Sequence, residues 1–318
     1  PYTLIEQWNG TSWSVVASPN QGSSGNDLYG VAAVSANNIW AVGVYDDSNF
    51  NRYTLIEHWN GTSWSIVASP NQTNYNDLYG VVVVSANNIW AVGDYGNSIG
   101  ANQTLIEHWN GTSWSIVASP NRNSSNNALY SVAGSANDLW AVGYYQGSKP
   151  SADQTLIEHW NGTSWSIVTS PNQGTRSNYL YSVTVGAANN IWAVGYYINS
   201  SNGARQTLVE HWNGTSWSIV ASPNQGSSSN YLYGVAGVSA NNIWAVGDFQ
   251  NSNNGVQQTL IEYWNGTSWS IVASPNPSSI SNVLSGVARV PGSINMWAVG
   301  YYAPTSIAQT STLTEFYG

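Results

Sequence analysis

The sequence predicts an all-β fold: a six-bladed β-propeller with four antiparallel strands per blade and a ring closed by the terminal strands. The first observation is that the segment Thr104–Val117, TLIEHWNGTSWSIV, is written six times with few changes. The second is its period, because the steps between equivalent tryptophans are 51, 50, 51, 52 and 52 residues. A repeat of about 50 residues built from short strands is typical of a propeller. These tryptophans are Trp8, Trp59, Trp109, Trp160, Trp212 and Trp264.

The repeated segment itself predicts a β-hairpin. Alternating runs at Thr104–Trp109 and Thr112–Val117 flank Asn110-Gly111, a pair that favours the positive φ angles of a type I′ turn. A two-residue loop would pair Trp109 with Thr112, and the two indoles would then be diagonal neighbours. The Asn-Gly-Thr triplet is also a formal glycosylation acceptor, but the turn explains it without a sugar.

The other half of the repeat predicts a second hairpin. Leu78–Val84 and Ile89–Tyr95 are rich in β-branched and aromatic residues and are joined by Ser85–Asn88. Each repeat therefore has four strands, called here the first to the fourth strand in chain order. Since one such sheet cannot bury both of its faces, we expect the copies to stack around an axis.

The ends of the chain predict one third strand more than six four-stranded blades need. Tyr2–Trp8 is a third strand, Thr11–Val16 is a fourth strand, and Thr312–Tyr317 is a degenerate further copy of the third strand. We expect the N-terminal fourth strand to complete the last blade and close the ring, which removes an open sheet edge. Either Tyr2–Trp8 or Thr312–Tyr317 is then surplus and could dangle, add to a blade edge or pair with another molecule. The repeats run without a linker, so we expect a single domain over residues 1–318.

Composition narrows the possible partners. The formal net charge is −9, with only 6 Lys and Arg residues, which argues against nucleic acid and anionic membranes. No apolar run reaches the roughly 18 residues of a membrane span. The chain has no Cys, which excludes disulfides and thiolate metal sites and fits an extracellular, secreted protein. It begins at Pro1 without an apolar leader, so we expect a signal peptide to have been removed.

Two motifs resemble known propeller families. Ile89–Gly93 and Glu107–Trp114 resemble a kelch-type blade of the galactose oxidase-like propellers, although the double glycine of that family is single here and its aromatic-to-Trp interval is shorter. Gly111–Trp114 is similar to the Asp-box hairpin of sialidase-like propellers, with Trp109 at the aspartate position. Both resemblances imply a propeller, and neither transfers a catalytic residue.

The residues that could support catalysis are spread out. Copper chemistry of the galactose oxidase type requires a Cys, and sialidase chemistry requires clustered arginines, whereas the five arginines here fall at unmatched positions in different blades. Four histidines share one repeat position, which a ring would hold apart, so we expect half-exposed strand histidines and no metal. We therefore expect no catalytic residue and no cofactor, and a protein that is not an enzyme. The histidines are His58, His108, His159 and His211.

In every copy of the repeat, a glutamate comes directly before the histidine position. Each repeat also has three tryptophans. A residue present in every blade indicates a structural task. We expect each glutamate to accept a hydrogen bond from backbone or from an indole N–H in a neighbouring strand or blade, since burial without a partner is costly. We expect the tryptophans to pack between blades rather than to serve as sugar platforms. The glutamates are Glu6, Glu57, Glu107, Glu158, Glu210, Glu262 and Glu315.

The loops after the second and fourth strands differ between repeats, so recognition is expected on the face that carries them. Tyrosines and aspartates at the ends of the second strands and in the loops before the first strands suit an uncharged polyhydroxyl ligand. The alternative is that these rings only complete the core between blades. The candidate ligand-binding residues are Tyr45, Tyr95, Tyr145, Tyr197, Phe249, Tyr302, Asp94, Asp248, Tyr75, Tyr179 and Tyr231.

The sequence thus favours a non-enzymatic extracellular binding module, lectin-like, that recognises glycans on this loop face with several similar sites. The alternative is a structural protein that assembles into filaments or a surface layer through its surplus strand, Tyr2–Trp8 or Thr312–Tyr317.

Overall fold

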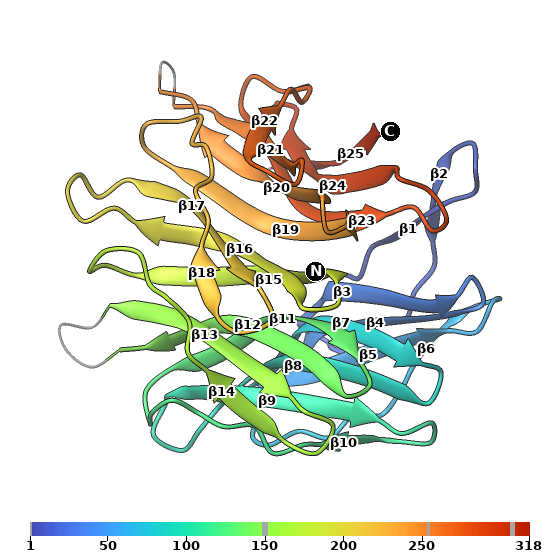
Figure 1. The fold of residues 1–318 in the computed structure, drawn as a ribbon. Helices are drawn as coiled ribbons and strands as arrows, with labels where there is room; N and C mark the ends of the chain where they lie inside the picture. Colours follow the sequence, from blue (N-terminus) through green and yellow to red (C-terminus); the bar gives the residue numbers. More distant parts are fainter. Residues whose placement is uncertain (1, 148–151, 253–254, 306–308) are drawn as a thin grey trace. The chain divides into compact units, whose positions relative to one another are not determined.

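A computed structural model describes residues 2–147, 152–252, 255–305 and 309–318 (Figure 1). The regular elements of these residues are β-strands. No helix among them is long and apolar enough to span a membrane. Parts of the variable loops Gln146–Gln154, Gln250–Gln258 and Ala303–Ser311 lie outside the described residues.

The strands follow the predicted fourfold pattern of each repeat. The first strands are β3 (Gly25–Ser35), β7 (Asn76–Ser85), β11 (Asn127–Ser135), β15 (Asn178–Ala187), β19 (Asn230–Ser239) and β23 (Ser281–Arg289). The second strands are β4 (Asn38–Asp46), β8 (Asn88–Gly96), β12 (Asp138–Gln146), β16 (Asn190–Ile198), β20 (Asn242–Gln250) and β24 (Met296–Ala303). The third strands are β1 (Ile5–Trp8), β5 (Arg52–Trp59), β9 (Asn102–Trp109), β13 (Asp153–Trp160), β17 (Arg205–Trp212), β21 (Gln257–Trp264) and β25 (Ser311–Tyr317). The fourth strands are β2 (Trp13–Val16), β6 (Trp64–Ile66), β10 (Trp114–Ile116), β14 (Trp165–Val168), β18 (Trp217–Ile219) and β22 (Trp269–Val272).

These strands form repeated four-stranded antiparallel sheets. β3–β6, β7–β10, β11–β14 and β15–β18 are four such sheets. β19–β25 form one mixed sheet, because a parallel bridge between Gln257 and Ser281 joins the four-stranded part β19–β22 to β23–β25. Isolated parallel bridges at the same repeat position, Arg52–Tyr75 and Arg205–Ser229, show that this contact recurs between neighbouring repeats. The arrangement is consistent with a β-propeller of about six blades.

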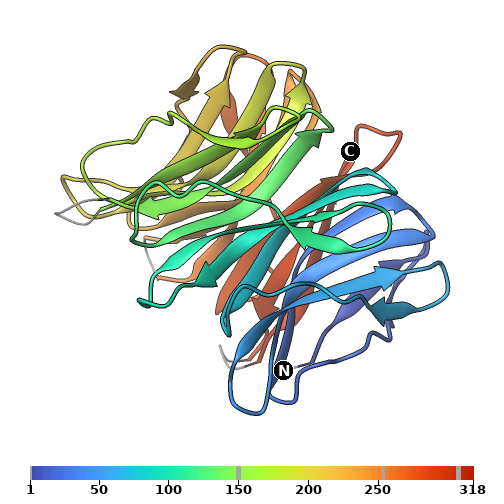
Figure 2. The same cartoon turned by 90° about the horizontal axis from the view of Figure 1, so that it is seen from below.

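The chain divides into two compact units, each described by itself. Unit 1 comprises Pro1–Ala141 and Glu158–Ile167, and unit 2 comprises Val142–Ile157 and Val168–Gly318. In unit 1, β7 packs beside β3 and β11, and in unit 2, β19 packs beside β15 and β23 (Figure 2). First strands are therefore neighbours, as expected for the inner strands of a propeller. The single-domain organisation and the closed ring stay predictions.

The Asn-Gly hairpin differs from the predicted register. Trp114 pairs with Trp109 and Ile116 with Glu107, so the loop has four residues rather than two. The Asn110 side chain accepts hydrogen bonds from the backbone N–H groups of Thr112 and Ser113 at 2.9 and 3.1 Å, and this Asx turn replaces the type I′ turn. Because the shift is two residues, the predicted faces persist, but the indoles lie directly opposite each other.

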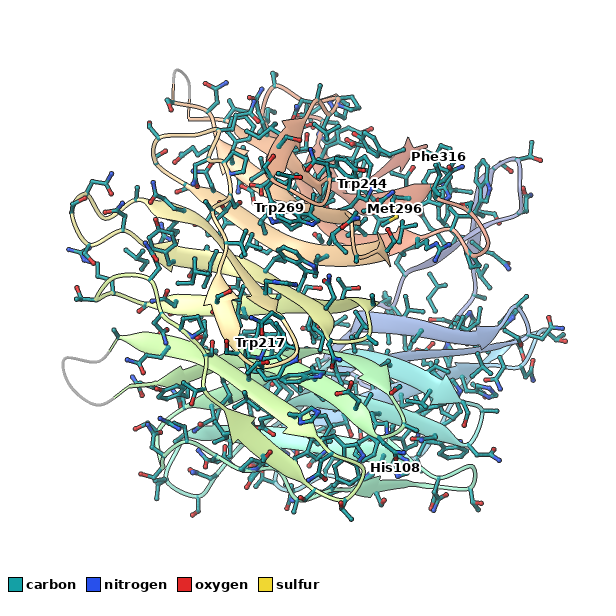
Figure 3. All side chains as sticks on the ribbon, viewed as in Figure 1. His108, Trp217, Trp244, Trp269, Met296 and Phe316 are labelled. Atoms are coloured by element: carbon teal, nitrogen blue, oxygen red, sulfur yellow. The ribbon has the colours of Figure 1, made fainter. Side chains whose placement is uncertain are left out.

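Tryptophans pack between neighbouring sheets, as predicted. In unit 1 the Trp40 ring lies 4.9 Å from Trp109 and 5.6 Å from Trp114 of the next sheet. The His58 ring lies 4.4 Å from the Trp40 ring, and its Nε2 lies 3.0 Å from the Asn38 side chain, so this histidine is part of the packing. Unit 2 repeats the contact between Trp192 and Trp269, and Figure 3 shows Trp269 and Trp244 there and His108 in unit 1.

The buried glutamates use a partner that the sequence did not predict. Five of them, from Glu107 to Glu315, accept a hydrogen bond from a serine hydroxyl of the preceding repeat rather than from backbone or indole. In unit 1 the Ser69 hydroxyl donates to Glu107 at 2.7 Å and also contacts the Thr54 hydroxyl at 2.7 Å. Burial raises the pKa of Glu107 to about 8, and the bond from Ser69 opposes this rise. Corresponding bonds are Ser119–Glu158, Ser170–Glu210, Ser222–Glu262 and Ser274–Glu315.

The C-terminal strand pairs as one of the two predicted alternatives expects. β25 pairs with β24, so Thr312–Tyr317 takes the third-strand position of the last repeat, and Ser274 bonds Glu315 there. β2 pairs with β1, and in the described part of the chain this hairpin is a sheet of its own. The closure of the ring by the N-terminal fourth strand stays a prediction. Both observed pairings join segments adjacent in sequence, which lose less chain entropy than distant ones.

Candidate functional site

Four repeat positions meet at one end of each sheet. They are the residues before and after the leucine of the first strand, the residue after the glycine of the second strand, and the first residue of the third strand. In unit 1, Asp77 pairs with Asp94 across β7 and β8, and Arg52 begins β5. Gly93 is required here, because a Cβ on it would lie 1.8 Å from the carbonyl oxygen of Asp77. The intervening Tyr79 is the extra residue of a β-bulge between Leu78 and Gly80.

Arg52, Tyr75, Asp77, Tyr79 and Asp94 form what we call the acidic cluster of unit 1. The Arg52 guanidinium lies 3.4 Å from the Asp77 carboxylate and 3.5 Å from that of Asp46. It also donates to the Tyr75 hydroxyl at 3.3 Å and lies 5.6 Å from the centre of that ring. Asp77 and Asp94 are buried, with 0% and 1% exposure. The Arg52 cation thus lies between the carboxylates of Asp77 in the cluster and Asp46 beside it.

Burial and mutual repulsion shift the two carboxyl groups. Burial raises the pKa of Asp77 to about 6, against the opposing charge of Arg52. Burial, followed by the charge of Asp77, raises the pKa of Asp94 to about 7. The nearby Tyr79 hydroxyl lowers both pKa values in part but does not cancel the rise. At neutral pH the pair therefore holds a proton for part of the time, as coupled buried carboxyls do.

Unit 2 carries tyrosines at the same positions. We call Tyr179, Tyr181, Tyr196, Tyr231 and Tyr233 the tyrosine cluster. Ring centres are 5.0 Å apart for Tyr179–Tyr196, 4.9 Å for Tyr196–Tyr231, 5.7 Å for Tyr231–Tyr233 and 5.6 Å for Tyr181–Tyr233. All five side chains are half-buried, so the rings form one continuous aromatic surface that solvent still reaches.

Polar groups border this surface. The guanidinium of Arg205 lies 5.9 Å from the centre of the Tyr231 ring. The Tyr179 hydroxyl donates to Asp153, and the Tyr233 hydroxyl bonds Asp248, whose pKa burial raises to about 6. The pKa of the Tyr196 hydroxyl is raised by burial and lowered in part by hydrogen bonds with Tyr181 and Arg205.

Five of the sequence candidates lie in or beside these clusters. Tyr75 and Asp94 belong to the acidic cluster, Tyr179 and Tyr231 belong to the tyrosine cluster, and Asp248 borders the latter. Whether they bind a ligand stays a prediction.

The other six candidates lie in the second strands. Each comes one residue after the position that Asp94, Tyr196 and Asp248 occupy. Because side chains alternate along a strand, they point to the opposite sheet face. Tyr145 and Tyr197 donate their hydroxyls to Gln154 and Gln206. Tyr45 contacts Tyr53, and Tyr95, Phe249 and Tyr302 pack against apolar core clusters.

Sequence reasoning missed the tyrosine that follows the leucine of the first strand. Its signal was the motif Leu-Tyr-Gly or Leu-Tyr-Ser in five repeats, which was interpreted only as a core strand. In unit 1 the Tyr79 ring lies 5.5 Å from Tyr29 and 5.3 Å from Tyr130. Sequence reasoning also treated the arginines as unmatched, but Arg52 and Arg205 both begin a third strand, two residues before its threonine.

Comparisons with known proteins support the fold. No family model and no curated protein matches the chain. Among solved structures, a protein of unknown function from Dyadobacter fermentans DSM 18053 is 11% identical, with a TM-score of 0.60 and coverage of 95% of this chain and 96% of that one. A PL25 ulvan lyase, a polysaccharide lyase bound to -[GlcA(1-4)Rha3S]-, is 11% identical with a TM-score of 0.57, covering 93% and 83%. YjhT is 11% identical with a TM-score of 0.52, covering 89% and 96%.

These neighbours are β-propeller proteins, but a kelch-type blade in particular is not confirmed. They also correct the expectation that the chain is not an enzyme. That expectation was wrong because it treated a propeller without an obvious catalytic motif as a propeller without chemistry, whereas a neighbour with the same fold is a polysaccharide lyase. At 11% identity the likeness is one of fold: the described chain has the repeated sheets of a β-propeller.

Proposed function

We propose that this protein binds a glycan on the tyrosine cluster of unit 2. The observation that carries the proposal is the continuous surface of five half-buried phenol rings, bordered by Arg205, Asp153 and Asp248. Aromatic faces pack against the C–H faces of sugar rings, while tyrosine hydroxyls and neighbouring polar groups bond sugar hydroxyls. An extracellular location is part of the proposal, since it accounts for a Cys-free chain with few charges.

The electrostatics of the cluster suit hydrogen bonding to hydroxyl groups. Burial raises the pKa of Tyr196, and it raises those of Tyr179, Tyr181 and Tyr233 still further. These phenols therefore remain protonated at neutral pH and can both donate and accept hydrogen bonds. In the acidic cluster of unit 1, by contrast, buried carboxylates occupy the matching positions and Arg52 is paired with them.

A glycan array followed by calorimetry tests the proposal. Tyr231→Ala and Tyr196→Ala should each weaken binding of a glycan selected on the array by about tenfold, equivalent to about 1.4 kcal/mol. Tyr197→Ala is the matched control, because Tyr197 follows Tyr196 in β16 but donates its hydroxyl to Gln206 on the opposite sheet face. The proposal is overturned if the folded protein binds no glycan, or if Tyr197→Ala weakens binding as much as Tyr196→Ala.

A pocket beside the N-terminal hairpin favours self-association as a second candidate function. A cavity of about 120 Å³ lies between this hairpin and the sheet β3–β6, lined by Ile5, Val16, Val31, Ile39, Trp59 and Trp64 among others. Between the next two sheets, Trp40 of a second strand packs on Trp109 and Trp114, which match Trp59 and Trp64. The pocket therefore suits a Trp-bearing second strand of another copy.

Light scattering distinguishes the two candidates. Val31 is 69% exposed at the rim of this pocket, so Val31→Asp should leave folding intact. If self-association occurs through the pocket, this substitution abolishes the oligomer without affecting glycan binding. A wild-type chain that remains monomeric at high concentration contradicts the second candidate.

A further inference from the structure

We propose that the ligand of the tyrosine cluster is an acidic saccharide, whose carboxylate or sulfate group is bound by Arg205 with Arg176 beside it. This inference rests on the proposed glycan function and adds the charge of the ligand. It revises the uncharged ligand expected from composition, because the net charge of −9 describes the whole chain and not this surface.

Hydrogen bonds fix the backbone of Arg205. Its backbone N–H donates to the carbonyl oxygen of Ser228 at 3.0 Å, and its carbonyl oxygen accepts from the Asn230 side chain at 3.4 Å. The main chain at the start of β17 is thus tied to the segment that leads into β19. The exposed side chain extends over the Tyr231 ring and beside the Tyr196 hydroxyl. A guanidinium held against an aromatic face needs little further ordering to bind an anion.

Arg52 occupies the same repeat position as Arg205 but has different neighbours. Arg52 pairs across the strands with Asp46 and forms ion pairs with Asp46 and Asp77. Arg205 pairs across the strands with Ile198, and Tyr231 stands where Asp77 stands for Arg52. Both positions that supply carboxylates to Arg52 therefore carry uncharged side chains around Arg205. A ligand carboxylate or sulfate can take their place.

Arg176 lies close to the loop that precedes Arg205. Its Nη1 atom lies 3.4 Å from the point that a Cβ of Gly203 would occupy, so its guanidinium lies on the loop that leads into Arg205. Its carbonyl oxygen accepts a hydrogen bond of 2.7 Å from the Asn178 side chain, which ties the base of this loop to β15. Arg176 is thus an exposed arginine beside the loop that leads into Arg205, which itself borders the tyrosine surface.

The carboxylates nearest this surface already have partners. Asp153 accepts from the Tyr179 hydroxyl. Asp248 is buried, bonds Tyr233, and accepts from the Gln257 side chain at 3.3 Å. Charge-assisted bonds from a guanidinium to an oxyanion are about twice as strong as neutral hydrogen bonds, so an acidic sugar should gain most from this arrangement.

The test compares two probes that differ only in charge: an oligouronide and the same oligosaccharide with its carboxyl groups reduced to alcohols. Calorimetry on the full chain should show at least tenfold tighter binding of the oligouronide. Arg205→Gln should remove this preference, and Arg176→Gln should reduce it. Added salt should weaken only the oligouronide, because salt screens exposed charges.

Arg289→Gln is the charge-matched control, since Arg289 is an exposed arginine of unit 2 at the end of β23, where the side chain donates to the Ser293 carbonyl oxygen. It should leave both affinities unchanged. Equal binding of the two probes, or an oligouronide preference that survives Arg205→Gln, overturns the inference while glycan binding stands. If neither these probes nor any glycan on the array binds the folded protein, the proposed function falls as well.

Discussion

The acidic cluster of unit 1 and the tyrosine cluster of unit 2 occupy the same positions of the same repeat but differ in what they can bind. Asp77 and Asp46 form ion pairs with Arg52, whereas Tyr231 and Ile198 at the matching positions leave Arg205 facing solvent. In unit 1 the charge of Arg52 is paired with carboxylates of the protein, and in unit 2 the charge of Arg205 has no such carboxylate at the matching positions. The difference shows that the same repeat positions can carry an internal ion pair or an exposed aromatic surface, depending on a few side chains.

The buried glutamates are common to both units and should produce the largest effect. Burial raises the pKa of Glu107, Glu158, Glu210 and Glu262 to about 8, well above the ordinary value of 4.5. Because the folded-state values are the higher ones, their contribution to stability is full below about pH 4.5 and is lost as the pH rises toward 8. The free energy of unfolding should therefore fall clearly between pH 5 and pH 8.

Urea unfolding at a series of pH values measures this dependence. Glu107→Gln, which keeps an acceptor for Ser69, should flatten the pH profile and stabilise the protein at pH 8. If the wild-type stability instead rises from pH 5 to pH 8, the buried glutamates are not responsible for it. Glu6→Gln is a suitable control, since Glu6 belongs to the N-terminal hairpin, whose sheet is separate.

Arg52→Gln should give the next largest effect, because it leaves Asp77 buried without its cation. Removing one partner of a buried ion pair costs about 3–5 kcal/mol, and we expect about 3 kcal/mol here because Arg52 is partly exposed. Arg205→Gln should change the free energy of unfolding by less than about 0.5 kcal/mol, as is usual for exposed side chains. Similar losses in the two variants would remove the proposed difference between the clusters. Arg52→Gln with Asp77→Asn should recover much of the loss.

Asp94→Asn should have a smaller effect of opposite sign. The pKa of Asp94 is raised from 3.8 to about 7, so its charge destabilises the fold increasingly as the pH rises from about 4 to 7. At pH 8 the substitution should stabilise the protein by about 1–2 kcal/mol, since it removes a buried charge beside Asp77. At pH 4 the two proteins should be equally stable. Thermal unfolding at the two pH values measures the difference, and a loss of stability at pH 8 would show that the Asp94 charge is compensated in the fold.

Much of the fold was predictable because its information is local. The period, the strand positions and the packing of tryptophans between sheets depend on residue types that repeat every 50 to 52 residues. The hairpin register was not predictable, because Asn110 can form either a type I′ turn or an Asx turn, and its contacts with Thr112 and Ser113 favour the Asx turn. About half of the candidate residues were found in or beside the clusters. The rest lie one residue away, on the opposite face of the strand.

The sequence by itself determined that this protein is a set of look-alike four-stranded sheets with a glutamate and three tryptophans in each repeat. Only the tertiary structure decided that five glutamates bond a serine of the preceding repeat, that β25 pairs with β24, and that Arg52 is neutralised while Arg205 is not. The physical reason is distance along the chain. Strand formation and turns depend on neighbouring residues, whereas the state of a charge depends on side chains brought beside it from repeats 20 or more residues away.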